Sequence, residues 1–179
     1  MTREKNAPIR SDSRDSLRVY VFQDSRANSK NVKFRVFMVL FRFFQYAYAR
    51  AASCTLIALL IDAVYRCISE TIFGLELPLK VRVGPGLRIY HGFGLVVNDA
   101  TIIGRDVVLR NGVVIGHRRS GGPVPRLADG VEVGATACIL GGVHIGRGAR
   151  IAAGAVVLRD VPADGLAIGN PARVAGTAR

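Results

Sequence analysis

An aliphatic side chain returns every six residues through most of the second half of the chain, from Val83 to Val157. A glycine often follows it directly, as at Gly134 and Gly146. A period of six fits neither an amphipathic helix nor a hairpin sheet, whose faces alternate in twos. It fits a short strand and a tight corner, with three such units closing one coil, so it predicts a parallel β-helix. The residues on this period are Val83, Ile89, Leu95, Val97, Ile103, Leu109, Ile115, Leu127, Val133, Ile139, Ile145, Ile151 and Val157.

Two irregularities interrupt the period. The register slips by two residues between Leu95 and Val97, shortly after His91. It breaks again between His117 and Arg126, where HRRSGGPVPR is typical of a loop. Because loops on a regular scaffold tend to carry function, we expect the chemistry beside these two breaks.

Large apolar residues recur at three- and four-residue steps over residues 32–50, which predicts a helix with one apolar face. They are Phe34, Phe37, Met38, Phe41, Phe44 and Tyr48. A second apolar run, residues 51–72, is interrupted by Asp62, well short of the roughly 20 apolar residues that a membrane span needs. Either these helices pack on each other and on a neighbouring subunit, or the basic, aromatic helix at 32–50 attaches peripherally to an anionic membrane face.

The composition divides the chain into three parts. Residues 1–16 are polar and predict a disordered tail, residues 17–73 an N-terminal helical segment, and residues 74–179 the β-helix with a C-terminal tail. The polar N-terminus lacks the apolar region of a secretory signal. We therefore expect a cytoplasmic protein, with the inner face of the membrane as the place of any peripheral contact.

The chain carries a net charge of +12, which suits nucleic acid, a membrane surface or an anionic small molecule. Tryptophan is absent and no alternating basic and aromatic platform appears, so we do not expect nucleic acid as a partner. The three cysteines share no metal-ligand spacing and no disulfide pattern, which indicates a reducing compartment and buried, apolar roles. They are Cys54, Cys67 and Cys138.

The repeat from Gly74 to Gly176 resembles the hexapeptide acyltransferases, whose [LIV]-G-x4 units build a left-handed β-helix. IYHGFGLVVNDATIIGRDVVLRNGVVIG and ILGGVHIGRGARIAAGAVVLRDVPADGLAIGNPARVAG are similar to the catalytic part of serine acetyltransferases. FQDSRANS more specifically resembles the colanic-acid-type exopolysaccharide O-acetyltransferases. The resemblance implies a mainly β fold with an N-terminal α-helical segment, a homotrimer with active sites between its prisms, and acetyl-CoA as co-substrate.

Moving an acetyl group from a thioester to a hydroxyl needs a base for the hydroxyl proton and donors for the oxyanion. His91, followed by Gly-Phe-Gly, aligns with the histidine that the family uses as base. Glu76, fifteen residues earlier, stands where serine acetyltransferases carry an aspartate that pairs with this histidine and fixes its tautomer. The competing interpretations are a surface histidine and a surface carboxylate.

The resemblance also implies that CoA lies in a groove between adjacent prisms, held largely by backbone groups. Small residues would line the pantetheine path and arginines would reach the phosphates, which a guanidinium binds in bidentate fashion. These positions are Gly116, His117, Ala135, Ala153, Arg150 and Arg173. His117 is in addition a candidate for acceptor contact. The alternatives are coil packing for the alanines, a solvated surface charge for each arginine and a loop position without function for His117.

Departures from the serine enzymes bear on the acceptor. Tyr90 stands where they have an aspartate, and Pro123-Val124-Pro125 where they have Arg-His-Pro. Those charged groups serve a zwitterionic amino acid, whose ammonium and carboxylate an apolar replacement cannot pair. Tyr90 and Phe93 suit the apolar face of a sugar ring, although inward packing would also account for them.

The sequence thus predicts an acetyl-CoA-dependent O-acetyltransferase that acts on a sugar hydroxyl of an exopolysaccharide or its lipid-linked precursor, with His91 as general base and no acyl-enzyme. The alternatives are a serine O-acetyltransferase of cysteine biosynthesis and a non-catalytic trimeric scaffold. We expect no metal, because gaps of 26 and 27 residues separate His91, His117 and His144, and zinc sites usually include a closely spaced pair. His144 is expected to be a solvated corner residue.

Overall fold

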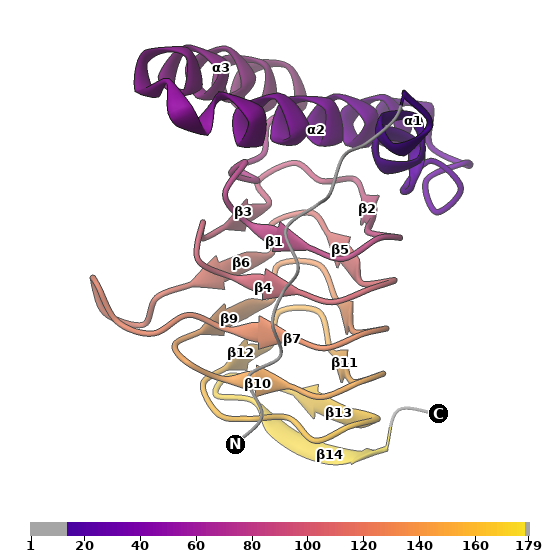
Figure 1. The fold of residues 1–179 in the computed structure, drawn as a ribbon. Helices are drawn as coiled ribbons and strands as arrows, with labels where there is room; N and C mark the ends of the chain where they lie inside the picture. The colour runs from indigo at the N-terminus through magenta and orange to yellow at the C-terminus, as the bar shows by residue number, and fades with distance from the viewer. Residues whose placement is uncertain (1–13, 178–179) are drawn as a thin grey trace, which may run out of the picture.

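A helical layer lies on top of a three-sided prism of coiled strands (Figure 1). The computed structural model describes residues 14–177. Of the predicted tail, residues 1–16, positions 1–13 lie outside the described residues. The first helix begins at Arg14.

The prism consists of three sheets whose strands pair in parallel between successive coils. Sheet A comprises β3 (Val96–Val97), β6 (Val114–Gly116), β9 (Cys138–Leu140) and β12 (Val156–Val157). Sheet B comprises β1 (Arg82–Val83), β4 (Ile102–Ile103), β7 (Arg126–Leu127) and β10 (His144–Ile145). Sheet C comprises β2 (Arg88–Tyr90), β5 (Val108–Arg110), β8 (Glu132–Val133), β11 (Arg150–Ile151), β13 (Gly165–Ile168) and the antiparallel β14 (Arg173–Thr177). Each coil passes from sheet B to C to A while it descends, which confirms the predicted left-handed β-helix (Figure 1).

The aliphatic period fills the interior of the prism. Leu109 and Ile139 are completely buried, and Ile89 is 1% exposed. The structure adds a second inward row two residues earlier, to which the fully buried Val107 and Ala137 belong. Two inward side chains per six-residue unit therefore fill the core between the coils.

The helical layer lies N-terminal to the prism. It comprises α1 (Arg14–Phe22), α2 (Val32–Arg50), a 3₁₀ turn (Ala51–Ser53), α3 (Thr55–Cys67) and a π-helical turn (Ile68–Phe73). The side chain of Asn31 accepts a hydrogen bond from the Phe34 N–H at 3.3 Å and so begins α2, as N-cap residues do. No helix of the described chain is both long enough and apolar enough to cross a membrane.

The layer covers the open end of the prism, whose strand edges would otherwise carry unpaired backbone groups. The apolar face of α2 is at most 3% exposed along Phe34, Phe37, Met38 and Phe41. Polar side chains of the layer bind the free carbonyl groups of the first coil. These bonds run from Gln45 Nε2 to Leu79 O (3.1 Å) and Val81 O (2.9 Å), from Tyr65 Oη to Leu77 O (2.8 Å), and from Ser69 Oγ to Leu75 O (2.7 Å).

One buried ion pair, which we call the polar latch, ties α2 to the first coil. Arg42 Nε lies 2.7 Å from Asp24 Oδ2, with both side chains 1% exposed. Arg42 also donates to the carbonyl oxygens of Val83 at 3.0 Å and Gly84 at 2.8 Å. Asp24 accepts from the Gly86 N–H at 2.7 Å, so every charge of the latch has hydrogen-bond partners on the prism, as a buried pair requires.

The cysteines differ from the prediction. Cys54 and Cys67 are exposed on the helical layer, and Cys138 is half-buried on sheet A. The prediction rested on residue type, but most of α3 is exposed, as are Cys54 directly before it and Cys67 at its last position.

Candidate active site

The outward side chains of the strands stack into columns, and the three sheets carry different columns. On sheet A the column is Val96, Val114, Cys138 and Val156, with Glu76 above it. On sheet B it is Arg82, Ile102, Arg126 and His144, and on sheet C it is Arg88, Val108, Glu132 and Arg150. The outer face of sheet A is therefore the apolar one.

His91 begins the corner that leads from sheet C to sheet A. Eight residues separate Ile89 from Val97, against six between Leu109 and Ile115 on the next coil, so the predicted slip lengthens this corner. The His91 backbone is left-handed at φ +54, and its carbonyl accepts a hydrogen bond from the Phe93 N–H. The imidazole is exposed.

A glycine fixes this corner against the helical layer. A Cβ on Gly92 would lie 2.7 Å from the Phe34 ring of α2 and from the Ile89 side chain. Only glycine fits there, which explains why Gly92 directly follows the exposed His91.

Two aromatic rings flank His91 at the surface. Phe93 is 66% exposed, and its ring lies beside Gly74, where a Cβ would be 2.8 Å from a ring carbon. The half-buried Tyr90 ring has the Arg110 guanidinium 5.1 Å from its centroid. Phe93 does not pack inward: the Lys33 ammonium group lies 5.2 Å from its ring centroid, and the rest of the ring is exposed.

The corners from sheet C to sheet A stack below His91 and form an edge, which we call the A/C edge. Ala135 and Ala153 lie on this edge, as does Gly154, where a Cβ would meet nothing within 4 Å. Hydrogen bonds join the corners: Gly112 N–H to Phe93 O (2.8 Å), Thr136 N–H to Asn111 O (2.8 Å), and Gly154 N–H to Ala135 O (2.9 Å). The small residues therefore leave this edge slim and open.

The two predicted phosphate-binding arginines lie in different places. Arg173 is exposed at the lower end of the A/C edge, directly after Ala172, whose N–H donates to Val156 O at 2.8 Å. Arg150 projects from sheet C, and its Nε lies 3.9 Å from Glu132 Oε2. Of the two, only Arg173 lies on the A/C edge.

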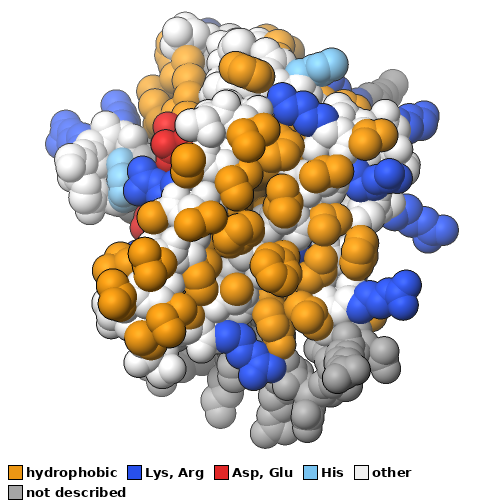
Figure 2. All heavy atoms as spheres, turned by 90° about the horizontal axis from the view of Figure 1, so that it is seen from above, with side chains coloured by type: hydrophobic (Ala, Val, Ile, Leu, Met, Phe, Trp, Pro, Cys, Tyr) orange, Lys and Arg blue, Asp and Glu red, His pale blue; other side chains and the backbone are white. Residues whose placement is uncertain are grey.

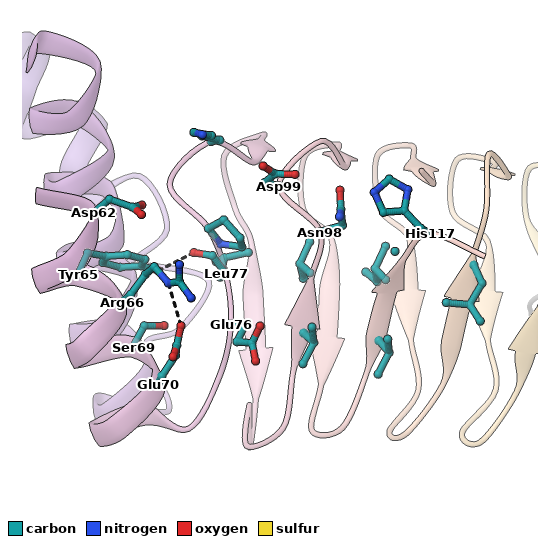
Figure 3. A pocket seen from close by; sticks show the side chains of 18 residues that line it. Asp62, Tyr65, Arg66, Ser69, Glu70, Glu76, Leu77, Asn98, Asp99 and His117 are labelled. Atoms are coloured by element: carbon teal, nitrogen blue, oxygen red, sulfur yellow. Dashed lines mark hydrogen bonds and ion pairs between the residues drawn. The ribbon is translucent and has the colours of Figure 1, made fainter. Parts of the chain in front are cut away.

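A hollow of about 480 Å³ lies between α3 and sheet A (Figure 3). Glu76, Asn98 and His117 line it from successive coils, and Asp62 and Arg66 line it from α3. His117 Nδ1 is buried with no hydrogen-bond partner among the described residues. Because buried polar atoms are normally paired, this nitrogen marks a position where a ligand or a neighbouring chain can donate or accept.

The charges facing Glu76 come from the helical layer. The pKa of Arg66 is raised, first by the hydrogen bond from its Nε to Glu70 at 3.1 Å, then by the charges of Glu70 and Asp62, and least by that of Glu76. No hydrogen bond or ion pair within residues 17–177 joins Glu76 to His91. The orienting role of Glu76 stays a prediction.

His91 and His117 lie at opposite edges of sheet A. His91 precedes β3, whereas His117 follows β6 on the next coil, where the chain leaves sheet A for sheet B. Gly116 is the last residue of β6 and lies beside His117. The sheet therefore separates the two histidines within one prism.

A second hollow, of about 660 Å³, lies lower on the same side and was not found from the sequence. Arg118, Arg119 and Arg159 line it together with Leu140 and Leu158. Three arginines and one carboxylate, Asp160, therefore line this hollow, which is predominantly basic. The sequence could not single them out, because the loop and the corner after β12 come together only in the coiled chain.

His144 is exposed on strand β10 rather than at a corner, and its backbone N–H donates to Asp160 Oδ1 at 2.8 Å. Among the described residues, no three His, Cys, Asp or Glu side chains are grouped closely enough to hold a metal ion.

Comparisons with known proteins group this chain with acetyltransferases. Residues 125–159 match the family described as bacterial transferase hexapeptide (six repeats). Serine acetyltransferase 4 of Arabidopsis thaliana is 38% identical over 120 residues, which cover 66% of this chain and 34% of that protein. The putative colanic acid biosynthesis acetyltransferase WcaB of Escherichia coli K12 is 38% identical over 112 residues, which cover 62% of this chain and 69% of that protein.

Solved structures extend the likeness to the whole described fold. Serine acetyltransferase from Brucella abortus superposes with a TM-score of 0.78 at 27% identity, covering 93% of this chain and 71% of that one. In sequence, this chain spans only 34%, 36% and 45% of three of the serine acetyltransferases that it matches.

Proposed function

Because this chain belongs to the hexapeptide-repeat acetyltransferases, we propose that it transfers the acetyl group of acetyl-CoA to a hydroxyl group of a second substrate. The observation that carries the proposal is the exposed His91 on the lengthened corner of the A/C edge, with the open path of small residues below it.

Each proposed residue has one role. His91 takes the proton of the acceptor hydroxyl as its oxygen attacks the thioester carbonyl, and backbone N–H groups beside that carbonyl stabilise the developing charge. Acetyl-CoA supplies an activated acyl group whose thiol leaves as the new ester forms. His91 then returns the proton to the departing thiolate, so protons balance and no acyl-enzyme is required. Glu76 orients the imidazole from sheet A.

The A/C edge fits the donor. Ala135 and Ala153 leave room for the pantetheine chain, and Gly116 and His117 would line the facing wall. The phosphates would meet Arg173, with Arg150 on the adjoining face. Arg118, Arg119 and Arg159 offer a second cluster of phosphate donors.

We propose a homotrimer in which sheet A of each prism faces a neighbour. The half-buried Val96, Val114 and Val156 give sheet A an apolar outer column, whereas the columns of sheets B and C contain charged residues. When a neighbouring prism covers this column, the A/C edge of one prism lies close to the opposite edge of sheet A, which carries His117, on the neighbouring prism. The site would then combine His91 of one subunit with His117 of its neighbour.

For the acceptor, we propose a sugar hydroxyl of an exopolysaccharide or its precursor. The supporting observation is chemical: Phe93 offers an exposed ring beside His91, and residues 88–94 contain no carboxylate for the ammonium group of an amino acid. The second candidate is serine O-acetylation. The names of the relatives favour serine at least as strongly, because serine acetyltransferases are prominent in both comparisons.

A thiol-release assay separates the candidates. Acetyl-CoA is offered with serine, with nucleotide sugars or with oligosaccharides, and the free thiol is measured for the wild type and for His91→Asn. Release that depends on a saccharide and on His91 supports the sugar proposal. Efficient release with serine would replace it by the second candidate. If no acceptor gives release and acetyl-CoA does not bind in calorimetry, the protein is a scaffold.

A further inference from the structure

The outer surface of the helical layer is strongly apolar. Figure 2 looks down on this layer and shows a broad field of hydrophobic side chains with Lys and Arg around it. Among the described residues, every exposed large hydrophobic side chain but Phe93, Ile168 and Val174 belongs to residues 19–72. These side chains are Val19, Phe22, Val32, Val36, Phe43, Leu56, Ile57, Leu59, Leu60, Val64 and Ile72.

The centre of this surface is α3. Leu56, Leu59 and Leu60 are 67%, 61% and 59% exposed, because α3 rests on the prism through Tyr65 on its opposite side. The aromatic face of α2, on which the predicted membrane contact of residues 32–50 depended, is instead buried on the first coil. Only the outer side of α2, with Val36 and Phe43, joins the apolar surface.

The charges of the layer are predominantly basic. Residues 17–73 contain eight Lys or Arg and three Asp or Glu, a difference of +5. Of the three acids, Asp24 is buried in the polar latch and Glu70 is paired with Arg66. The exposed basic residues are Arg18, Arg26, Lys30, Lys33, Arg35, Arg50 and Arg66.

We propose that this surface docks on an anionic lipid bilayer. An apolar field rimmed by Lys and Arg is the arrangement with which amphipathic helices lie in a membrane interface, their apolar side chains reaching the acyl boundary and their cations the headgroups. A second copy of the chain would bring like basic rims together, which charge repulsion opposes.

The geometry sets how the protein sits on the bilayer. The layer covers one end of the prism, so the coils extend away from the docked surface (Figure 1). A hollow of about 440 Å³, lined by Phe22, Val36, Val39, Leu40 and Arg35, opens between α1 and α2 and is apolar enough to receive part of an acyl chain. In a trimer of parallel prisms, three such surfaces face the same way, and their binding is multivalent.

Vesicle cosedimentation of the full chain tests the docking. The wild type should bind vesicles of phosphatidylcholine with phosphatidylglycerol, and it should bind vesicles of pure phosphatidylcholine at least tenfold more weakly. High salt should weaken binding to the anionic vesicles. The double variant Leu59→Gln, Leu60→Gln should reduce binding at least tenfold. Arg35→Glu should reduce it about 25-fold, since each unit of charge near an anionic surface contributes about fivefold and the reversal changes the charge by two units.

Matched controls lie far from the layer. Val174→Gln removes an exposed apolar side chain at the other end of the prism, and Arg126→Glu reverses a charge on sheet B; both should bind like the wild type. Equal binding by the leucine variant and the wild type would overturn the proposal. A second result would also overturn it: the wild type does not bind vesicles, and the leucine variant forms a smaller oligomer than the wild type in sedimentation velocity. That result would assign the surface to a second copy.

Discussion

His91 combines an exposed imidazole with a left-handed backbone, and this combination decides how its role should be tested. Asparagine tolerates φ near +54 better than alanine does, so His91→Asn removes the base while preserving the corner. We expect a loss of acetyl transfer of about 10²- to 10⁴-fold, the usual contribution of a general base. Thiol release measured at saturating acetyl-CoA gives the value.

The matched control for this variant is His144→Asn, which alters an exposed histidine on sheet B. It should retain full activity, and both variants should melt within a few degrees of the wild type. Activity that survives in His91→Asn would remove this residue from the chemistry.

Glu76 offers a second test at this scale. Glu76→Gln keeps the length of the side chain and the backbone bridge to Val96 but removes the charge. If the carboxylate orients the imidazole, kcat falls while the KM for acetyl-CoA stays unchanged. An unchanged kcat would contradict the positioning role. Arg66→Gln is the control for a merely local change of charge.

The residues of the site differ in how far the sequence reveals them. His91 follows from a motif and a break in the period, both of which are local. Arg118, Arg119 and Arg159 carry no local signal, because their common hollow exists only once the loop folds back on sheet A. The unpaired Nδ1 of His117 depends on burial, which the sequence does not give.

At the scale of elements, the attachment of α2 to the prism depends on the polar latch. Arg42→Met would leave the buried Asp24 without its cation, and removing one partner of a buried pair costs about 3–5 kcal/mol. We expect the free energy of unfolding in urea to fall by about 3 kcal/mol, because Asp24 keeps its backbone donors at Gly86 and Leu87. Arg35→Met, which removes an exposed arginine of the same helix, should change it by less than about 0.5 kcal/mol. Equal effects of the two variants would show that the latch is not what holds α2.

The elements themselves were largely predictable. The three- and four-residue spacing gave α2 its bounds, since one face alone is rich in large side chains. The same reasoning could not orient α3, which is apolar nearly all round, so its sequence does not say which side contacts the prism. The exposed cysteines follow from this ambiguity.

At the scale of the whole molecule, the proposed trimer depends on the outer column of sheet A. Val114→Glu places a charge in that column and should convert the trimer into monomers in sedimentation equilibrium, with loss of activity. Ile102→Glu is matched to it, because Ile102 is also half-buried and outward-facing but lies on sheet B. A trimer that tolerates Val114→Glu would place the interface elsewhere.

The separation of His91 and His117 by sheet A leads to a stricter test, complementation between two defective subunits. His91→Asn should be inactive alone, and His117→Asn should be strongly impaired if its buried nitrogen contacts a substrate. The two variants are unfolded together and refolded as mixed trimers. A site is then intact where the unaltered His91 of one subunit meets the unaltered His117 of the next. In random trimers this holds for about one quarter of the sites. Recovery of about that share of wild-type thiol release would assign each site to two subunits. Because a site built within a single prism can never be restored by mixing, activity no greater than the average of the two separate variants would refute the shared site.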